Sequence, residues 1–204
     1  MEEMNFASDF DESLLFGVVW NLHCFMGKKY DVAVSADDLN NFIPWEEYFD
    51  ISREEVILTE GEFYRSKTYK HMVLDPTGLK VLWMIREHPK CRFGDIVTRR
   101  HKRHTWATEL LSPKGLFRKK VHTNYQSKIE NYDHFSEVKF YFEDSVQSAC
   151  EVAVQYPESM VFIIRQPWNK IALDRYEYVP LPNVHVVNDW KEIGRKVENI
   201  LSKA

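Results

Sequence analysis

The sequence has too few glycines and cysteines for several common kinds of enzyme site. Only seven of its 204 residues are glycine, and it contains neither a Gly-x-x-x-x-Gly-Lys loop nor a Gly-x-Gly-x-x-Gly fingerprint, so P-loop and dinucleotide-binding sites are unsupported. A Gly-x-Ser-x-Gly turn and a His-Glu-x-x-His helix are also missing. The three cysteines are far apart in the sequence. They predict reduced core thiols of a cytosolic-type compartment rather than disulfides or a zinc site.

A strong charge imbalance and a long apolar run are also missing. The net charge is −4, so no global field attracts the chain to nucleic acid or to an anionic membrane. The longest apolar stretch, Leu14 to Trp20, is far shorter than the about 20 residues that span a bilayer. The acidic N-terminus lacks the basic and apolar regions of a signal peptide. We therefore expect a cytoplasmic protein without a membrane partner, with one core domain and room for a small insert.

Short apolar runs alternate with helical stretches through the second half of the chain. Strands are predicted at 4–10, 92–97, 119–122, 138–142, 160–165 and 184–187, and helices at 102–112, 126–133, 145–154 and 189–202. This alternation is typical of βαβ units, so we predict an α/β fold with a parallel sheet of about five strands. The segment after the first strand is mostly helical. Its helices are predicted at 14–28, after a capping box at 52–55, at 61–70 and at 75–87.

Asp9 and Asp11 lie two residues apart where the first strand is predicted to end. Side chains alternate faces along a strand, so both carboxylates point the same way, and Ser13 is the next residue in that register. Such a group can hold a divalent cation and attack phosphorus. Alternatively, the same pattern caps helices and begins turns.

Three later segments carry groups that would complete such a site. The apolar run 96–98 ends in Thr98, Lys128 lies in a polar segment, and the strand 138–142 leads into Glu143 and Asp144. The carboxyl ends of parallel strands form the ligand-binding edge of an open sheet. Asp9, Thr98 and Asp144 are therefore expected to meet there. A purely structural alternative is that Glu143 and Asp144 cap the following helix.

With these residues in order, the chain resembles the haloacid dehalogenase-like (HAD) phosphohydrolase superfamily over almost its whole length. The resemblance implies a HAD-like Rossmannoid core formed by residues 1–13 and 91–204, and a small helical cap formed by residues 14–90. The 5'(3')-deoxyribonucleotidase and bacterial or phage nucleotidase branch is the most similar one. The local likenesses to that branch are Thr98-Arg99-Arg100, Pro167-Trp168-Asn169 and the segment Asn188–Ile193.

The resemblance implies a Mg²⁺-dependent phosphomonoesterase that forms an aspartyl-phosphate. Asp9 would be the nucleophile and Asp11 the general acid and base. Thr98 would bind a phosphoryl oxygen, and Lys128 would neutralise phosphate charge and orient Asp9. Other candidates for the lysine are Lys119 and Lys120.

Oxygen ligands suit Mg²⁺. The expected ligands are Asp9, the backbone carbonyl of Asp11, and Asp144, with Glu143 acting through water. Two positions depart from the usual family pattern. Glu143 stands where Asp is usual, and Glu12 stands where Gly is frequent and adds negative charge near a phosphate site. These departures favour an altered activity or a non-catalytic binding protein as alternatives.

The expected substrate is a small phosphomonoester, most of all a deoxynucleoside or nucleoside monophosphate. The expected substrate contacts are Ser13, Arg100, Phe42, Trp45 and Tyr48, although aromatic residues at such spacing also form plain core. The basic run 99–104 has three interpretations: phosphate attraction, contact with a nucleic-acid end, or a solvated helix start. A phosphatase of nucleic-acid ends is thus a second alternative, which we do not favour.

Overall fold

The computed structural model describes residues 3–41, 44–174 and 181–203. It confirms an α/β fold with one parallel sheet, in the strand order β3-β2-β1-β4-β5-β6. The strands are β1 (Asn5–Ser8), β2 (Gly94–Thr98), β3 (Lys119–His122), β4 (Val138–Glu143), β5 (Met160–Ile164) and β6 (Val184–Val187). The expectation of about five strands was one too low, because both edge segments, β3 and β6, pair fully with their neighbours.

Helices connect the strands and also form a separate layer. The α-helices are α1 (Val18–Tyr30), α2 (Trp45–Tyr48), α3 (Arg53–Arg65), α4 (Lys67–Lys70), α5 (Pro76–Arg86), α6 (Thr105–Leu111), α7 (Lys128–Asn131), α8 (Val146–Gln155), α9 (Lys170–Asp174) and α10 (Trp190–Leu201). Within the described residues, the 3₁₀ segments are η1 (Ala36–Asn41), η2 (Lys102–His104), η3 (Phe135–Glu137) and η4 (Pro167–Asn169). None of the helices in the described ranges is long and apolar enough to cross a membrane.

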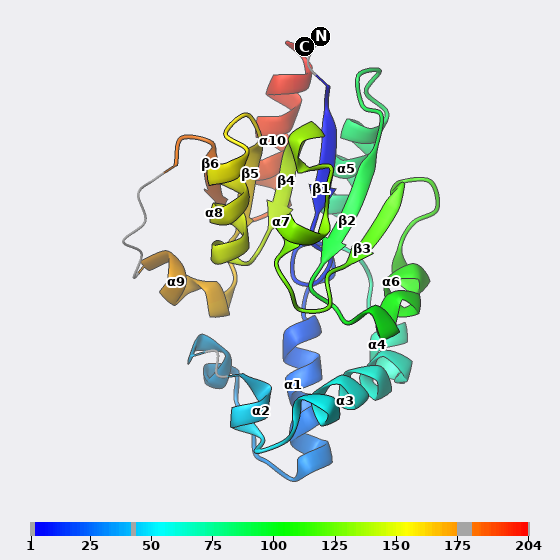
Figure 1. The fold of residues 1–204 in the computed structure, drawn as a ribbon, viewed down its shortest axis with the longest axis vertical. Coiled ribbons are helices and arrows are strands. Elements are labelled where there is room, and N and C mark those ends of the chain that lie inside the picture. The colour runs from blue at the N-terminus through cyan, green and yellow to red at the C-terminus, as the bar shows by residue number, and fades with distance from the viewer. Residues whose placement is uncertain (1–2, 42–43, 175–180, 204) are drawn as a thin grey trace.

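The sheet separates two hydrophobic cores because successive side chains point to opposite faces. On β4, Phe140 and Phe142 lie in the core that α5 and α10 cover, whereas Tyr141 lies in the core covered by α8. Figure 1 shows these helices on opposite sides of the sheet. Strands β2, β4 and β5 are buried almost throughout, as expected of a sheet that is covered on both faces.

Helices α1 to α4 extend beyond the carboxyl ends of the strands (Figure 1). Helix α5 belongs to the predicted cap insert by sequence, yet it packs against α10 and β1 beside the sheet. The division between core and cap at residues 13 and 91 stays a prediction. The observed packing places α5 with the sheet and α1 to α4 at the edge where ligands bind in such folds.

The first predicted helix begins later than expected. Residues 10–17 form a tight turn in which the N–H groups of Leu14 and Leu15 donate to the carbonyl of Phe10. Gly17 follows with a φ of 79°, a left-handed conformation that glycine adopts without steric cost, and α1 starts at Val18. Leu14 and Leu15 are fully buried, so tertiary packing rather than helical periodicity explains their apolar character.

Candidate active site

The carboxyl ends of β1, β2 and β4 bring the predicted catalytic residues together. Ser8 pairs with Ile96 of β2 and with Phe142 of β4, so the residues that follow these positions are neighbours. Asp9, Thr98 and Glu143 consequently line one cavity of about 570 Å³. Its other lining residues include Asp11, Arg100 and Asp144 from the core and Trp45 from the α1–α4 layer. The cavity therefore lies between the sheet edge and that layer.

Lys128 is the lysine that reaches this carboxylate cluster. Its Nζ lies 3.1 Å from Asp9 Oδ1 and 2.6 Å from Glu143 Oε2, and its side chain is 1 % exposed. The competing candidates have partners elsewhere, since Lys119 contacts His134 and Lys120 pairs with Glu109. A lysine is buried only when its charge is compensated. The two carboxylates beside Lys128 provide that compensation.

Three carboxylates share this end of the cavity. Ligand oxygens of Asp9, Glu143 and Asp144 lie within 4.8 Å of one another. Burial raises the pKa of Asp9 to about 6, against the opposing charge of Lys128. Burial and the charges of Glu143 and Asp9 raise the pKa of Asp144 well above its usual range. One ammonium group does not balance this repulsion. The all-oxygen cluster therefore fits a hard divalent cation such as Mg²⁺.

Within this cluster, Glu143 is already saturated by protein donors. Its Oε1 accepts the N–H groups of Asp144 and Ser145, and its Oε2 accepts Lys128 Nζ and the Tyr141 hydroxyl. Burial opposes ionisation, but the charge of Lys128 keeps the pKa of Glu143 below its usual value. This arrangement supports the predicted indirect role of Glu143, in which the direct ligand is Asp144.

Asp144 is held by a loop to which the sequence analysis gave no role in the site. Trp168 Nε1 donates to Asp144 Oδ2 at 2.9 Å. Asn169 Nδ2 donates to the backbone carbonyls of Asp144 at 2.7 Å and Ile164 at 2.8 Å. Both residues belong to the Pro167-Trp168-Asn169 segment that carried part of the family resemblance. The resemblance of this segment was therefore the sequence signal for the role of Trp168 and Asn169 in positioning Asp144.

Asp11 forms an ion pair with Arg100 at the side of the cavity. Arg100 Nε donates to Asp11 Oδ2 at 2.6 Å and Arg100 Nη2 pairs with Asp11 Oδ1. The third nitrogen, Nη1, donates to the Tyr69 hydroxyl at 2.9 Å. The guanidinium carbon also lies 4.5 Å from the centre of the Tyr64 ring. Arg100 was predicted to contact substrate; it lines the cavity, and its N–H groups donate to Asp11, to the Tyr69 hydroxyl and to Thr108 Oγ1.

Glu12 was expected to add negative charge near a phosphate site, and it does line the cavity, but its carboxylate is bonded to the start of α1. Its two carboxylate oxygens accept the N–H groups of Gly17 at 2.9 Å and Val19 at 2.6 Å. These are unpaired donors at the start of α1, which favour a negative group. Burial raises the pKa of Glu12 to about 7, so its negative charge is disfavoured at this position. Glu12 thus acts as a cap of α1, a role that follows only from the turn before Gly17.

The predicted substrate contacts are only partly brought to the cavity. Trp45 lines it, whereas Ser13 and Tyr48 are not among its lining residues. Ser13 is fully buried, with its carbonyl accepting Trp190 Nε1 at 2.7 Å. The Tyr48 hydroxyl donates to Asp38, and its ring packs on His23. Phe42 lies outside the described residues.

The basic run is engaged by protein groups. Arg99 donates to Ser148 Oγ at 2.8 Å, Arg103 pairs with Glu54 at 2.7 Å, and His104 Nε2 contacts the carbonyl of Ile57 at 3.0 Å. The last two contacts join η2 to α3. This run therefore joins the sheet-side loop to the α1–α4 layer. Lys102 and Arg103 are exposed at the start of η2, as a solvated helix start predicts, and Arg99 and Arg100 line the cavity.

Four further lining residues belong to none of the predicted substrate or catalytic groups. They are Arg53, Glu60, Tyr64 and Tyr125. The first three lie on α3 and the last follows β3. Sequence reasoning missed them because the cavity is formed by segments that are distant in the chain.

Comparison with known proteins gives a match of fold without a match of sequence. No protein-family model and no curated protein matches the sequence. The fold is similar to a haloacid dehalogenase-like hydrolase from Streptococcus pneumoniae, with a TM-score of 0.67 at 14 % identity over 95 % of this chain and 98 % of that one. A predicted phosphatase from Clostridium acetobutylicum has a TM-score of 0.66 at 13 % identity, with coverage of 98 % and 100 %.

A third similar structure is a HAD hydrolase of family IA, variant 3, from Entamoeba histolytica, with a TM-score of 0.64 at 15 % identity over the full length of both chains. Identities this low establish the fold and leave the reaction to be argued from the site. The parallel sheet, the strand order and these similarities together show that the chain has the HAD-like Rossmannoid fold.

Proposed function

We propose that the protein is a HAD-type, Mg²⁺-dependent phosphomonoesterase that acts on deoxynucleoside or nucleoside monophosphates. The observation that carries this proposal is the position of Lys128 Nζ between Asp9 and Glu143, two carboxylates that line a cavity together with Thr98 and Asp144. A buried cation beside a strand-end carboxylate provides a place where phosphoryl oxygens are stabilised and a nucleophile is oriented.

In the first step, a carboxylate oxygen of Asp9 attacks phosphorus and the ester P–O bond breaks. Asp11 gives its proton to the departing oxygen, and Arg100 holds Asp11 in position through its two nitrogens. In the second step, Asp11 takes a proton from water. The water oxygen attacks phosphorus, the bond from phosphorus to Asp9 breaks, and phosphate leaves. Lys128 and Thr98 bind the phosphoryl oxygens throughout.

Mg²⁺, when bound, would neutralise charge on the phosphoryl oxygens. It would be held by Asp9, Asp144 and the backbone carbonyl of Asp11, since Glu143 is occupied by four donors. Support for a nucleotide comes from the cavity, whose volume of about 570 Å³ lies in the range of small-molecule sites. Trp45 provides an aromatic surface there for a planar base.

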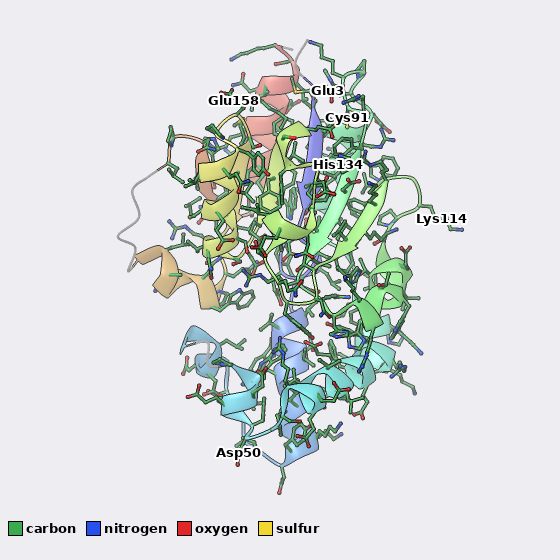
Figure 2. All side chains as sticks on the ribbon, in the orientation of Figure 1. Glu3, Asp50, Cys91, Lys114, His134 and Glu158 are labelled. Atoms are coloured by element: carbon green, nitrogen blue, oxygen red, sulfur yellow. The ribbon has the colours of Figure 1, made fainter. Side chains whose placement is uncertain are left out.

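The test is phosphate release from a panel of nucleoside and deoxynucleoside monophosphates with Mg²⁺, with EDTA, and with Asp9→Asn. We expect release that needs the metal and is abolished in Asp9→Asn. The matched control is Asp50→Asn, because Asp50 lies at the far end of the α1–α4 layer (Figure 2). Release that survives in Asp9→Asn would overturn the mechanism. Nucleotide binding without release from any substrate would indicate a non-catalytic protein.

A further inference from the structure

Glu60 is a buried carboxylate that faces the candidate active site from α3. It is 4 % exposed, and it lines the same cavity as Asp9 and Asp11. Carboxylates are rarely buried to this extent unless a partner compensates the cost of desolvation. The mechanism proposed above gives Glu60 no task.

Tyr125 fixes the orientation of this carboxylate. The Tyr125 hydroxyl donates to Glu60 Oε2, and His104 Nε2 lies 3.9 Å from the same oxygen. Among the described residues, Glu60 Oε1 has no hydrogen-bond partner. One oxygen is thus held by the protein, while the other is available as an acceptor at the cavity wall.

The loop that presents Tyr125 has an unusual backbone. Asn124 and Tyr125 have φ values of 57° and 64°, a left-handed conformation that non-glycine residues rarely adopt. Their N–H groups donate to the carbonyls of Arg100 at 3.2 Å and Arg99 at 2.7 Å, which hold the loop in this form. Such strain is concentrated at functional sites and needs surrounding structure to maintain it. Here it places the Tyr125 hydroxyl on Glu60.

Glu60 lies near the position of the leaving group. Glu60, Asp11 and Arg100 line the same cavity, and Tyr64, one turn along α3 from Glu60, has its ring centre 4.5 Å from the guanidinium carbon of Arg100. Burial raises the pKa of Glu60 to about 7. Asp11 is the group that protonates the ester oxygen in the proposed mechanism. When the ester oxygen of a substrate lies at Asp11, the neighbouring atoms of the leaving group therefore lie close to Glu60.

The remaining cavity wall offers a different surface. Its apolar lining residues include Val18, Val19, Leu22, Pro44, Trp45 and Ala172. The cavity thus has an apolar and aromatic wall in addition to the carboxylate of Glu60. A leaving group that fits it has a hydroxyl near the ester and an apolar or planar part.

We propose that Glu60 determines specificity by accepting a hydrogen bond, through Oε1, from a hydroxyl of the leaving group close to the ester oxygen. The inference rests on the proposed function and narrows its substrate class to phosphorylated sugars that carry a planar or apolar group. In a nucleoside 5'-monophosphate this hydroxyl is the 3'-hydroxyl. Plain alkyl and aryl phosphates lack it.

The test compares kcat/KM for thymidine 5'-monophosphate and 3'-deoxythymidine 5'-monophosphate. The assay is run at pH 9, above the Glu60 pKa of about 7, so that the carboxylate is charged. A hydrogen bond to a charged acceptor then predicts a preference of about 10- to 100-fold for the nucleotide with the hydroxyl. Glu60→Gln should reduce this preference about tenfold, because a neutral amide is the weaker partner. Glu62→Gln is the matched control, since it makes the same change at an exposed position of the same helix.

Equal kcat/KM values for the two nucleotides in the wild-type protein would overturn the inference, and that comparison needs no variant to fold. An unchanged preference in Glu60→Gln would overturn it as well. Dissociation constants of both nucleotides, measured with Asp9→Asn, separate this inference from the proposed hydrolysis. If no phosphate is released but the binding preference exists and is lost when Glu60→Gln is added, the hydrolysis proposal fails and the role of Glu60 stands.

Discussion

At the scale of single residues, the site depends on one buried ammonium group among carboxylates. Lys128 Nζ contacts both Asp9 and Glu143. All three side chains are buried, so water solvates their charges poorly. Removing one partner of such a buried group is far more costly than removing an exposed ion pair, because the remaining charges stay desolvated.

We expect Lys128→Met to lower the free energy of unfolding by about 3 kcal/mol at pH 8, and to abolish any phosphate release. Asp9, whose pKa burial already raises to about 6, loses the cation that lowers it. A carboxyl whose pKa is higher in the folded than in the unfolded state lowers the free energy of unfolding at a pH above the folded pKa. This loss of stability disappears as the pH falls toward about 4, the pKa of the unfolded state. The stability loss should therefore be smaller at pH 5 than at pH 8.

Urea unfolding of the wild type and of Lys128→Met at pH 5 and pH 8 measures this loss of stability. Lys119→Met serves as the control, since Lys119 is exposed and contacts His134. It should change stability by less than about 0.5 kcal/mol at either pH. A loss for Lys128→Met that is equally large at pH 5 and pH 8 would contradict the assignment of buried carboxylates to this lysine.

At the scale of elements, the loop after β5 positions the acid that follows β4. Asn169 joins the two strand ends through its bonds to the carbonyls of Asp144 and Ile164, and it is 4 % exposed. Partners of metal-binding residues that do not touch the metal typically affect affinity strongly, since they fix the orientation of the ligand. The loop therefore belongs to the candidate metal site although it lies more than twenty residues from Asp144 in the chain.

We expect Asn169→Ala to weaken Mg²⁺ binding about 10- to 100-fold, because Asp144 loses the group that holds its backbone. The measurement is calorimetric titration of the protein with MgCl₂, which does not depend on turnover. Asn199→Ala, on the exposed side of α10, is the matched control and should bind Mg²⁺ like the wild type. Equal affinity in Asn169→Ala would show that the loop has no part in the metal site.

At the scale of the whole molecule, α10 near the C-terminus holds both α5 and the segment after β1. Trp190 is 1 % exposed, donates to the carbonyl of Ser13, and packs on Phe142. A Cβ atom on Gly78 of α5 would lie 2.8 Å from the Trp190 indole, so the two helices meet at a position where only glycine fits. The loop that carries Asp9 and Asp11 is thereby supported from behind by the end of the chain.

We expect Gly78→Ala to destabilise the protein by about 1–3 kcal/mol, since overpacking a rigid indole outweighs the gain in helix propensity. Propensity alone predicts the opposite sign, a gain of about 1 kcal/mol. Thermal unfolding decides between the two. The same substitution is also made in a Trp190→Phe background, where the indole is gone. If Gly78→Ala lowers the stability of the Trp190→Phe protein as much as it lowers that of the wild type, the steric explanation is wrong.

The sequence by itself determined the α/β class, the parallel sheet and most element positions, because apolar periodicity and strand-end chemistry are local properties. The chain order of Asp9, Thr98, Lys128 and Asp144 also determined the expected site, since parallel strand ends meet at one edge. Whether those residues catalyse the proposed reaction stays a prediction.

Only the tertiary structure decided which other side chains surround that edge. Arg100 pairs with Asp11, and Glu60 meets Tyr125, across segments that are far apart in the sequence. Glu12 caps α1 because the intervening residues form a turn. The tertiary structure also decided that Ser13 and Tyr48 lie away from the cavity and that α5 packs beside the sheet. The physical reason is that burial and pairing of polar groups depend on neighbours brought together by folding, which no local pattern encodes.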